Sequence, residues 1–280
     1  MNQYEKAIAF RDLHQGPHVF ILPNAWDVAS ALIFAQAGFP AIGTTSAGVA
    51  ATLGYPDGEQ IHLSELLPIL KRMAERVNLP ITADIEAGYG RTITAVAENV
   101  RAVIATGVVG INLEDAPGEE GQPLVTLARQ ARVIRAIRLV AKEVKVPLVI
   151  NARTDVFWRK VGDPDNQLTQ AVERANAYRE AGADCLFLPG VSDRETIAKL
   201  VDQIRGPVNI LAGPGAPSIP ELERLGVARV SVGSGPIRAA LALMRGIAQE
   251  LLTKGTYTRL TEETIPYEEL GELLARAGEL

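Results

Sequence analysis

The sequence predicts a single (β/α)8 TIM barrel, an α/β fold, with an extra C-terminal helix. The 280-residue chain has a length at which such barrels commonly form one domain. Eight short apolar runs alternate with eight helical patterns, and Gly or Pro stands at most of the expected helix ends. A doubly wound sheet would normally carry a Gly-x-Gly-x-x-Gly turn after an early strand, and the sequence has none.

Each expected strand is a short apolar run bounded by turn residues. The first, His18–Pro23, follows Gly16-Pro17 and precedes an alanine-rich helix expected from Val28 to Gly38. The other strands are expected at 41–45, 81–84, 109–113, 147–151, 184–188, 208–212 and 229–232.

The expected helices follow the 3.6-residue spacing of apolar positions. An opening helix to about Leu13 would bury Tyr4, Ile8 and Leu13. Later helices are expected at 63–77, 94–106, 127–144, 168–181, 194–204, 219–225 and 237–252. No linker divides the chain, so residues 1–280 are expected to form one domain. Residues 257–280 would be a helical tail, with one helix near 268–274, that packs on a neighbouring subunit.

Composition excludes several classes of function. The net charge of −5 comes without any Lys/Arg-rich run, which argues against nucleic acid or an anionic membrane surface as a partner. No signal-peptide core and no stretch of about 18 apolar residues is present, so a cytoplasmic protein is expected. The single cysteine, Cys185, is expected in the core, and the positions of His14, His18 and His62 disfavour a zinc site.

The stretch Pro80–Gly90 contains the strongest local signal. A short apolar run leads into Asp84 and Glu86, two residues apart, and a Gly-Tyr-Gly turn follows. If the strand continues through both acids, period-two alternation places them on one face. Two such oxygen ligands suit Mg²⁺. The alternative is a pair of solvated acids at a strand end.

Other polar residues gather at the expected strand ends, where barrel enzymes carry their chemistry. Four acids from three strand ends would converge on one cation, with one or two bound directly and the others holding its waters. Arg153 would face an anionic substrate, and Ser46-Ala47-Gly48 would offer backbone N–H groups to a carboxylate. A structural ion-pair network is the alternative, and Gly233-Ser234-Gly235 is either a phosphate site or a plain turn. The four acids are Asp57, Asp84, Glu86 and Glu114.

Five motifs in order resemble the isocitrate lyase / phosphoenolpyruvate mutase superfamily. The resemblance runs by motif from about Asn24 to Arg153. The motifs are Thr45-Ser46-Ala47-Gly48, Gly54-Tyr55-Pro56-Asp57, Asp84-Ile85-Glu86-Ala87-Gly88-Tyr89-Gly90, Asn112-Leu113-Glu114-Asp115 and Asn151-Ala152-Arg153-Thr154-Asp155.

The resemblance implies a barrel that binds Mg²⁺, with Mn²⁺ as an alternative, and a small 2-oxo acid. It also implies a homo-oligomer, dimer or tetramer, that exchanges a helix between neighbours. Asp84 matches the direct metal ligand, and Arg153 matches the arginine beside the oxo group. The acids matching the water-holding positions are Asp57, Glu86 and Glu114, and the substrate-binding positions besides Asp84 and Arg153 are Trp26, Thr45, Ser46, Ala47 and Gly48.

The expected activity is C–C bond cleavage or decarboxylation of a 2-oxo acid or 2-hydroxy dicarboxylate through a metal-bound enolate. Arg153, Glu114 and Tyr55 are the catalytic candidates. Tyr89, Glu119 and Glu120 are further candidates for the acid or base, and the sequence does not choose among them. Two alternatives are hydrolysis of a P–C bond, as in phosphonopyruvate, and binding of a 2-oxo acid with little turnover.

The chain also departs from the superfamily pattern. Residues 116–123 lack the Lys-Lys-Cys-Gly-His sequence of the isocitrate and methylisocitrate lyases, whose cysteine is the general acid. Glu86 stands where many members have Asp. Residues 187–190 lack the lyase glutamate, and Gly213 falls where the lyases have Asn. Cleavage of isocitrate by the usual acid is therefore not expected, and the grip on a second substrate carboxylate is expected to be reduced.

Overall fold

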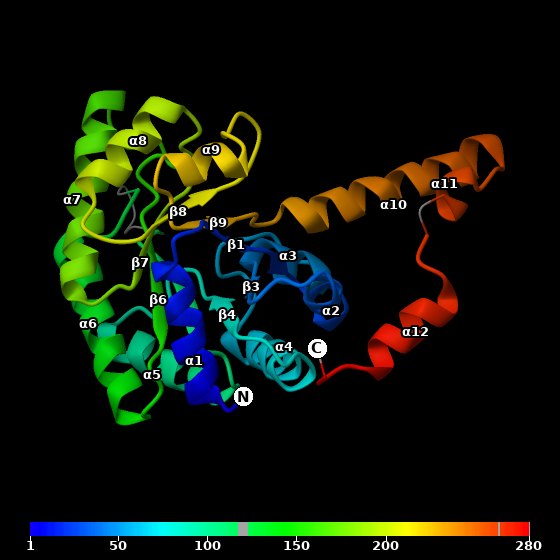
Figure 1. The fold of residues 1–280 in the computed structure, drawn as a ribbon, viewed down its shortest axis with the longest axis horizontal. Coiled ribbons are helices and arrows are strands. Elements are labelled where there is room, and N and C mark those ends of the chain that lie inside the picture. Colours follow the sequence, from blue (N-terminus) through cyan, green and yellow to red (C-terminus); the bar gives the residue numbers. More distant parts are fainter. Residues whose placement is uncertain (117–122, 263, 280) are drawn as a thin grey trace.

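The computed structural model describes residues 1–116, 123–262 and 264–279, and it confirms the predicted barrel (Figure 1). Neighbouring strands are parallel throughout this part of the chain. The strands are β1 (Phe20–Leu22), β2 (Asn24–Ala25), β3 (Ile42–Thr44), β4 (Ile81–Asp84), β5 (Gly110–Glu114), β6 (Val149–Arg153), β7 (Cys185–Leu188), β8 (Val208–Leu211) and β9 (Arg229–Ser231).

The first predicted strand is present as β1, and Pro23, which has no N–H group to donate to a sheet, separates it from β2, a short strand that was not predicted. β1 pairs with β9 and β2 pairs with β3, so this one segment closes the barrel. Hydrogen bonds of the Asn24 side chain stabilise the closed barrel. Its Oδ1 accepts the N–H groups of Val232 and Gly233 at 3.0 and 2.9 Å, and its Nδ2 donates to the Thr44 carbonyl at 2.8 Å.

The predicted helices are present, with shifted ends, in the described residues. They are α1 (Gln3–Asp12), α2 (Val28–Gln36), α4 (Leu63–Arg76), α5 (Ile93–Ala105), α6 (Leu127–Glu143), α7 (Pro164–Ala181), α8 (Arg194–Gln203), α9 (Ile219–Arg224), α10 (Gly235–Lys254) and α12 (Tyr267–Ala275). α7 begins four residues before the expected start because Asp163 caps it and Pro164 is suited to its first turn. None of the described helices combines the length and apolar character needed to cross a membrane.

Two features of the helices differ from expectation. The helix α3 (Ser46–Leu53) was not predicted; Thr45 caps it and Gly54 ends it in a left-handed conformation. The apolar face expected for α1 is wrong. Ala7 and Phe10 are the buried residues of that helix, and Tyr4 is 56% exposed.

α1 closes the N-terminal end of the barrel. The rings of Phe10, His14 and Phe20 meet edge to face, with centroids 5.0 to 6.0 Å apart. The Phe10 ring comes so close to Gly110 that a Cβ there would lie 2.7 Å from it, so this position requires glycine. Cys185 is fully buried in β7, which confirms its expected place in the core.

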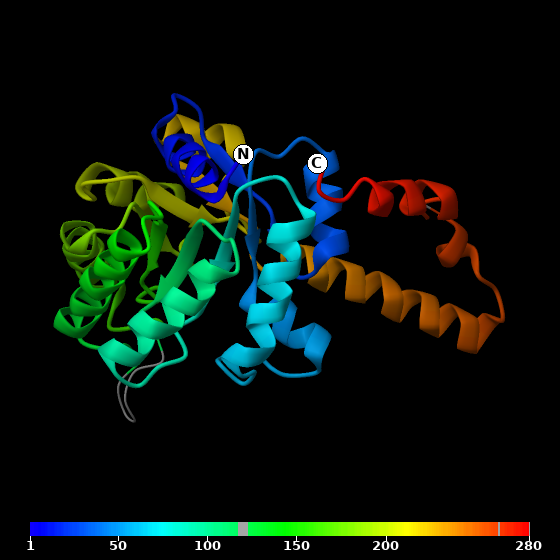
Figure 2. The same cartoon turned by 90° about the horizontal axis from the view of Figure 1, so that it is seen from below.

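Helices α10, α11 (Thr258–Thr261) and α12 form an arm, residues 235–279, that leaves the barrel and turns back toward it (Figures 1 and 2). Ile237 is the one buried residue among the described side chains of α10. The arm returns at α4, where Arg76 donates to the Leu274 carbonyl at 3.1 Å and its own carbonyl accepts the Gly278 N–H. The expected tail helix is therefore present as α12.

The buried His14 predicts a pH dependence of stability. Its Nδ1 lies 2.8 Å from the Phe10 carbonyl and its Nε2 has no partner. Burial, helped by Arg229, lowers the pKa of His14 from 6.5 to about 3. Between these values the unfolded chain binds the proton and the folded chain does not. Stability is therefore full above pH 6.5 and falls below it, by about 1.4 kcal/mol per pH unit.

Urea unfolding of the wild type and of His14→Gln at pH 8 and pH 5.5 measures this contribution. The wild type should lose about 1.4 kcal/mol more than the variant over that interval. The difference between the proteins is the readout, because other groups also titrate in both. Equal pH dependence in the two proteins would contradict the assignment.

Candidate active site

A cavity of about 110 Å³ opens at the C-terminal ends of the strands. It is the place where the predicted site residues come together. Six of them line it: Thr45, Ser46, Ala47, Asp57, Asp84 and Arg153. The wall also contains apolar side chains, namely Trp158, Phe187, Pro189 and Leu211.

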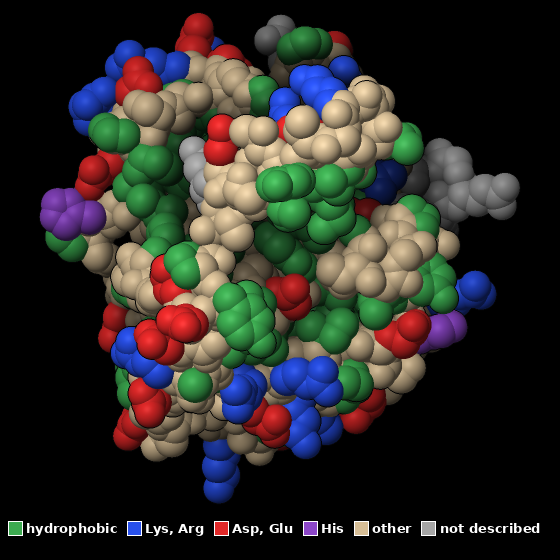
Figure 3. Space-filling model, turned by 90° about the vertical axis from the view of Figure 1, so that its right-hand side faces the viewer, with side chains coloured by type: hydrophobic (Ala, Val, Ile, Leu, Met, Phe, Trp, Pro, Cys, Tyr) green, Lys and Arg blue, Asp and Glu red, His purple; other side chains and the backbone are tan. Residues whose placement is uncertain are grey.

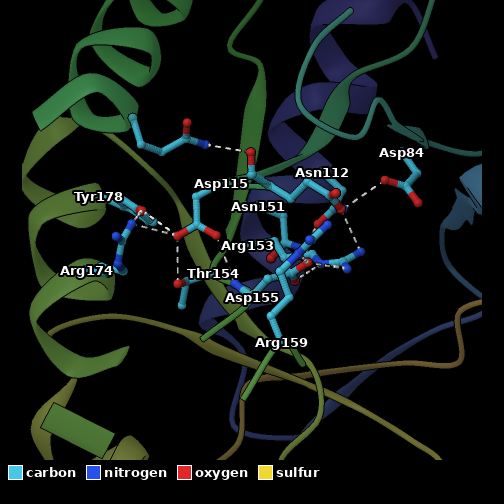
Figure 4. A network of polar contacts seen from close by, with 12 residues as sticks. Asp84, Asn112, Asp115, Asn151, Arg153, Thr154, Asp155, Arg159, Arg174 and Tyr178 are labelled. Atoms are coloured by element: carbon cyan, nitrogen blue, oxygen red, sulfur yellow. Dashed lines mark hydrogen bonds and ion pairs between the residues drawn. The ribbon is translucent and has the colours of Figure 1, made fainter. Parts of the chain in front are cut away.

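Asp84 is held rigidly at the end of β4. Its Oδ2 accepts the Ser46 N–H at 3.0 Å, and its Oδ1 accepts Nδ2 of Asn112 at 2.8 Å. Asn112 is oriented in turn by Asn151, whose Nδ2 donates to it at 2.9 Å (Figure 4). The Asp84 N–H donates to the Thr44 hydroxyl at 2.8 Å. Three neighbouring strands therefore fix the direction of this carboxylate.

Glu86 reaches the site in a different way from the one expected. β4 ends at Asp84, and Glu86 has a φ of 50°, so period-two alternation does not relate the two acids. A left-handed φ is unusual for a residue with a side chain, and contacts hold it in place. The carboxylate accepts the Glu59 N–H at 2.6 Å and the Tyr89 hydroxyl at 3.1 Å.

The acids of the site repel one another. Burial, followed by the charges of Asp84 and Asp57, raises the pKa of Glu86 to about 7. Burial also raises the pKa of Asp57, with the Asp84 charge adding to the effect and a hydrogen bond with Ser46 opposing it. A cation placed among these carboxylates would relieve the repulsion.

This arrangement fits Mg²⁺. No three His, Cys, Asp or Glu side chains in the described parts of the chain already have the spacing of a complete ligand set. Mg²⁺ needs no such set, because it takes one or two carboxylates directly and keeps several waters. Asp84 is placed to bind directly, and Asp57 and Glu86 to hold waters.

Arg153 lies between two buried carboxylates. It donates to both oxygens of Asp155, at 2.5 and 2.9 Å, and its Nη1 lies 2.8 Å from Glu114. Burial opposes the charge on Arg153, but Glu114 and Asp155 outweigh it and the pKa of Arg153 is raised. Burial likewise raises the pKa of Glu114 well above its ordinary range. The Glu114 carboxyl group therefore retains a proton more readily than a carboxyl group in water.

Asp115 positions the loop that follows Arg153 (Figure 4). This fully buried side chain accepts the Thr154 hydroxyl at 2.8 Å and the Asp155 N–H at 2.9 Å. It also accepts the Tyr178 hydroxyl at 2.7 Å and Nη1 of Arg174 at 3.1 Å. Asp115 thereby connects α7 to the end of β6.

The remaining predicted residues lie around the cavity or away from it. Trp26 packs behind Gly48, where a Cβ would lie 3.0 Å from the Trp26 Cβ. Glu114 and Tyr89 line a second cavity. Tyr55 is 46% exposed and lines neither cavity. Glu119 and Glu120 lie outside the described residues.

Sequence reasoning missed three residues of the site. Glu59 accepts the Tyr89 N–H at 2.6 Å and so joins two loops distant in sequence. Trp158 lines the cavity from the loop after β6. Arg229 lines it from β9, and a charged residue in a strand expected to be buried was the available signal. The first two had no recognisable signal.

Comparison with known proteins identifies relatives along nearly the whole chain. A family model described as phosphoenolpyruvate phosphomutase matches residues 10–252. An uncharacterised protein of Mycobacterium tuberculosis is 38% identical over 94% of this chain and 95% of its own. Oxaloacetate decarboxylase of Rhodopseudomonas palustris is 31% identical over 88% of this chain and 87% of its own.

Solved structures agree with this relationship. A Burkholderia cenocepacia protein, provisionally described as a lyase/mutase, matches with a TM-score of 0.91 and 36% identity, over 98% of this chain and 97% of its own. The structure of 2,3-dimethylmalate lyase, described as a PEP mutase/isocitrate lyase superfamily member, matches with a TM-score of 0.83 and 26% identity. That match covers 96% of this chain and 95% of the lyase.

The Asp115 contacts predict a large loss of stability in Asp115→Ala. The substitution leaves Arg174 without a carboxylate partner in a partly buried site, so urea unfolding should show a loss of about 3–5 kcal/mol. The matched variant Tyr178→Phe removes two hydrogen bonds, one donated to Asp115 and one accepted from Arg174, and should lose about 2 kcal/mol. Losses of equal size in the two variants would contradict the central position given to Asp115.

Proposed function

The chain belongs to the isocitrate lyase / phosphoenolpyruvate mutase superfamily, and from this we propose that it is a Mg²⁺-dependent lyase acting on a small 2-oxo acid. The reaction is C–C bond cleavage or decarboxylation next to the oxo group. One observation carries the proposal. Asp57, Asp84 and Glu86 crowd together beside Arg153 at the mouth of the barrel.

The residues of the chain have separate roles in this reaction. At the N-terminus of α3 the Ala47 N–H group faces the substrate carboxylate, while the N–H groups of Ser46 and Gly48 already donate to Asp84 and Thr45. Arg153 stabilises negative charge on the oxo oxygen. Asp84, Asp57 and Glu86 hold Mg²⁺, which would supply Lewis-acid polarisation of the oxo acid. Glu114, whose pKa is raised by burial, carries a proton.

The size of the cavity supports a short substrate. A volume of about 110 Å³ admits a small oxo acid and leaves no room for a long side chain. Its wall at Phe187, Pro189 and Leu211 is apolar. Hydrolysis of a P–C bond in phosphonopyruvate is the alternative reaction, and analysis of products with each substrate separates the two.

We also propose that the chain forms a homo-oligomer through its arm. Residues 1–280 would form one barrel domain, with residues 257–280 as a helical tail that packs on a neighbouring subunit. The arm carries large apolar side chains that its own chain leaves exposed, among them Leu252 at 87% and Tyr267 at 93%. Figure 3 views the side of the molecule from which the arm projects, with hydrophobic side chains gathered on the surface. Contiguous exposure of this kind marks an interaction surface.

Ligand-dependent thermal stability tests the site. Pyruvate, oxaloacetate, 2-oxoglutarate, phosphonopyruvate and methylisocitrate are compared with and without Mg²⁺. A ligand that binds only the folded chain raises the unfolding midpoint. At least one 2-oxo acid should do so with Mg²⁺. Asp84→Ala should abolish the shift and Arg153→Ala should weaken it at least tenfold in ligand concentration.

The matched control is Asp202→Ala, an exposed acid of α8, which should keep the full shift. A shift that survives in Asp84→Ala would contradict the metal site. No shift with any ligand in the wild type would contradict the proposed function.

Light scattering tests whether the arm mediates formation of the oligomer. The double variant Leu252→Glu with Tyr267→Glu places charge on the proposed contact surface and should reduce the particle mass to that of a smaller assembly or a monomer. Leu139→Glu, an equally apolar exposed position on α6, is the control and should keep the wild-type mass. A monomeric wild type would refute the proposed assembly.

A further inference from the structure

Arg229 occupies an unusual place for a charged residue. It begins β9, in register with Phe20 of β1 and Asn209 of β8. Its exposed fraction is 2%, and the side chain forms part of the floor of the 110 Å³ cavity. Strand residues at this level of a barrel are usually apolar, so a guanidinium here needs an explanation.

The guanidinium group has no partner among the described residues. Its Nε and Nη1 make no hydrogen bond, and no carboxylate forms an ion pair with it. Nearby, Nδ2 of Asn209 and the Thr82 hydroxyl are also buried without partners, as is Oδ1 of Asn151. An unpaired buried charge is strongly destabilising, and so are unsatisfied buried donors.

Within the described parts of the chain, no acidic group forms an ion pair with Arg229. The charge of Asp84 raises the pKa of Arg229, but the two Asp84 oxygens already accept hydrogen bonds from Ser46 and Asn112. Burial raises the pKa of the Cys185 thiol to about 12, so this neighbour is neutral. Burial lowers the pKa of Arg229 only to about 10, so the guanidinium stays charged at neutral pH.

We propose that the floor of the cavity is a binding site for a small singly charged anion, held by Arg229 and the Thr82 hydroxyl. Both side chains line the cavity, and the Nε and Nη1 donors of Arg229 and the Thr82 hydroxyl have no hydrogen-bond partner in the described residues. Water would satisfy these donors but not the charge. An anion satisfies both.

The anion has two sources with the same chemistry. It is either a free ion of the size of chloride, formate or bicarbonate, or a second carboxylate on the bound substrate. The second source rests on the proposed function and would supply the carboxylate grip that the sequence appeared to lack after β7 and β8. The site lies at the floor of the same cavity that Asp57, Asp84 and the first turn of α3 line.

The first experiment uses the full chain without substrate and with a chelator, so that it does not depend on the proposed function. Chloride or formate replaces a large sulfonate anion at constant ionic strength, and the thermal unfolding midpoint is measured. A saturable rise of about 5 °C in large excess of the anion is expected. No saturable rise in the wild type would overturn the proposal.

Two variants locate the effect. Arg229→Met removes the charge at similar volume and should lose the rise. Asn209→Asp provides a carboxylate inside the protein and should also lose it. Arg194→Met, an exposed arginine of α8, should keep the rise. A rise that is unchanged in both Arg229→Met and Asn209→Asp would overturn the assignment.

A competition experiment identifies the source of the anion. With Mg²⁺ present, a dicarboxylate such as oxaloacetate should weaken the chloride effect if its second carboxylate occupies the site. If the increases in the unfolding midpoint caused by chloride and by oxaloacetate are additive, the occupant of the anion site is a free ion. Failure of every 2-oxo acid to bind would refute the proposed function, while the chloride result in the first experiment would still stand.

Discussion

The shared ion pair at the end of β6 is the contact on which the mouth of the barrel depends. Arg153 faces Asp155 with two donors and Glu114 with one. Arg153 thus contacts two buried carboxylates, with Arg159 3.7 Å from Asp155 as a second cation, and neither arginine forms an ion pair with Asp84, Asp57 or Glu86. The repulsion that remains among these three acids is the physical basis of the proposed cation site. Asp115 supports the ion pairs of Arg153 from behind, because it fixes the backbone that carries Asp155.

The barrel was predictable because its signals are local. Apolar runs, helical spacing and the Gly or Pro residues after each helix are all read within a few residues. The prediction of the elements was wrong where one local sequence pattern is compatible with two structures. Ser46–Leu53 is rich in small residues and was expected to be a loop, but Thr45 and Gly54 provide the caps of a helix. Pro23 was expected to end the first strand, but a second short strand, β2, follows it directly.

The site was predictable where motifs follow directly after strands, as for Asp84 and Arg153. Glu86 was assigned to the site by an argument that its backbone contradicts, since a left-handed turn and not strand alternation brings it there. Arg229, Glu59 and Trp158 were missed because their roles depend on contacts between distant loops and strands. Such contacts leave no periodic trace in the sequence.

β1 and β2 pair with strands from opposite ends of the sequence, so the barrel can close only late in the synthesis of the chain. Asn24 joins strands from the two ends of the chain, and its bond to Gly233 spans 209 residues. Closing so long a loop costs chain entropy before any contact forms, so this seam belongs to the late steps of folding. A nascent chain still lacking β9 has neither a partner for β1 nor a floor to its cavity. The ribosome must therefore release nearly the whole barrel before the chain can bind a ligand.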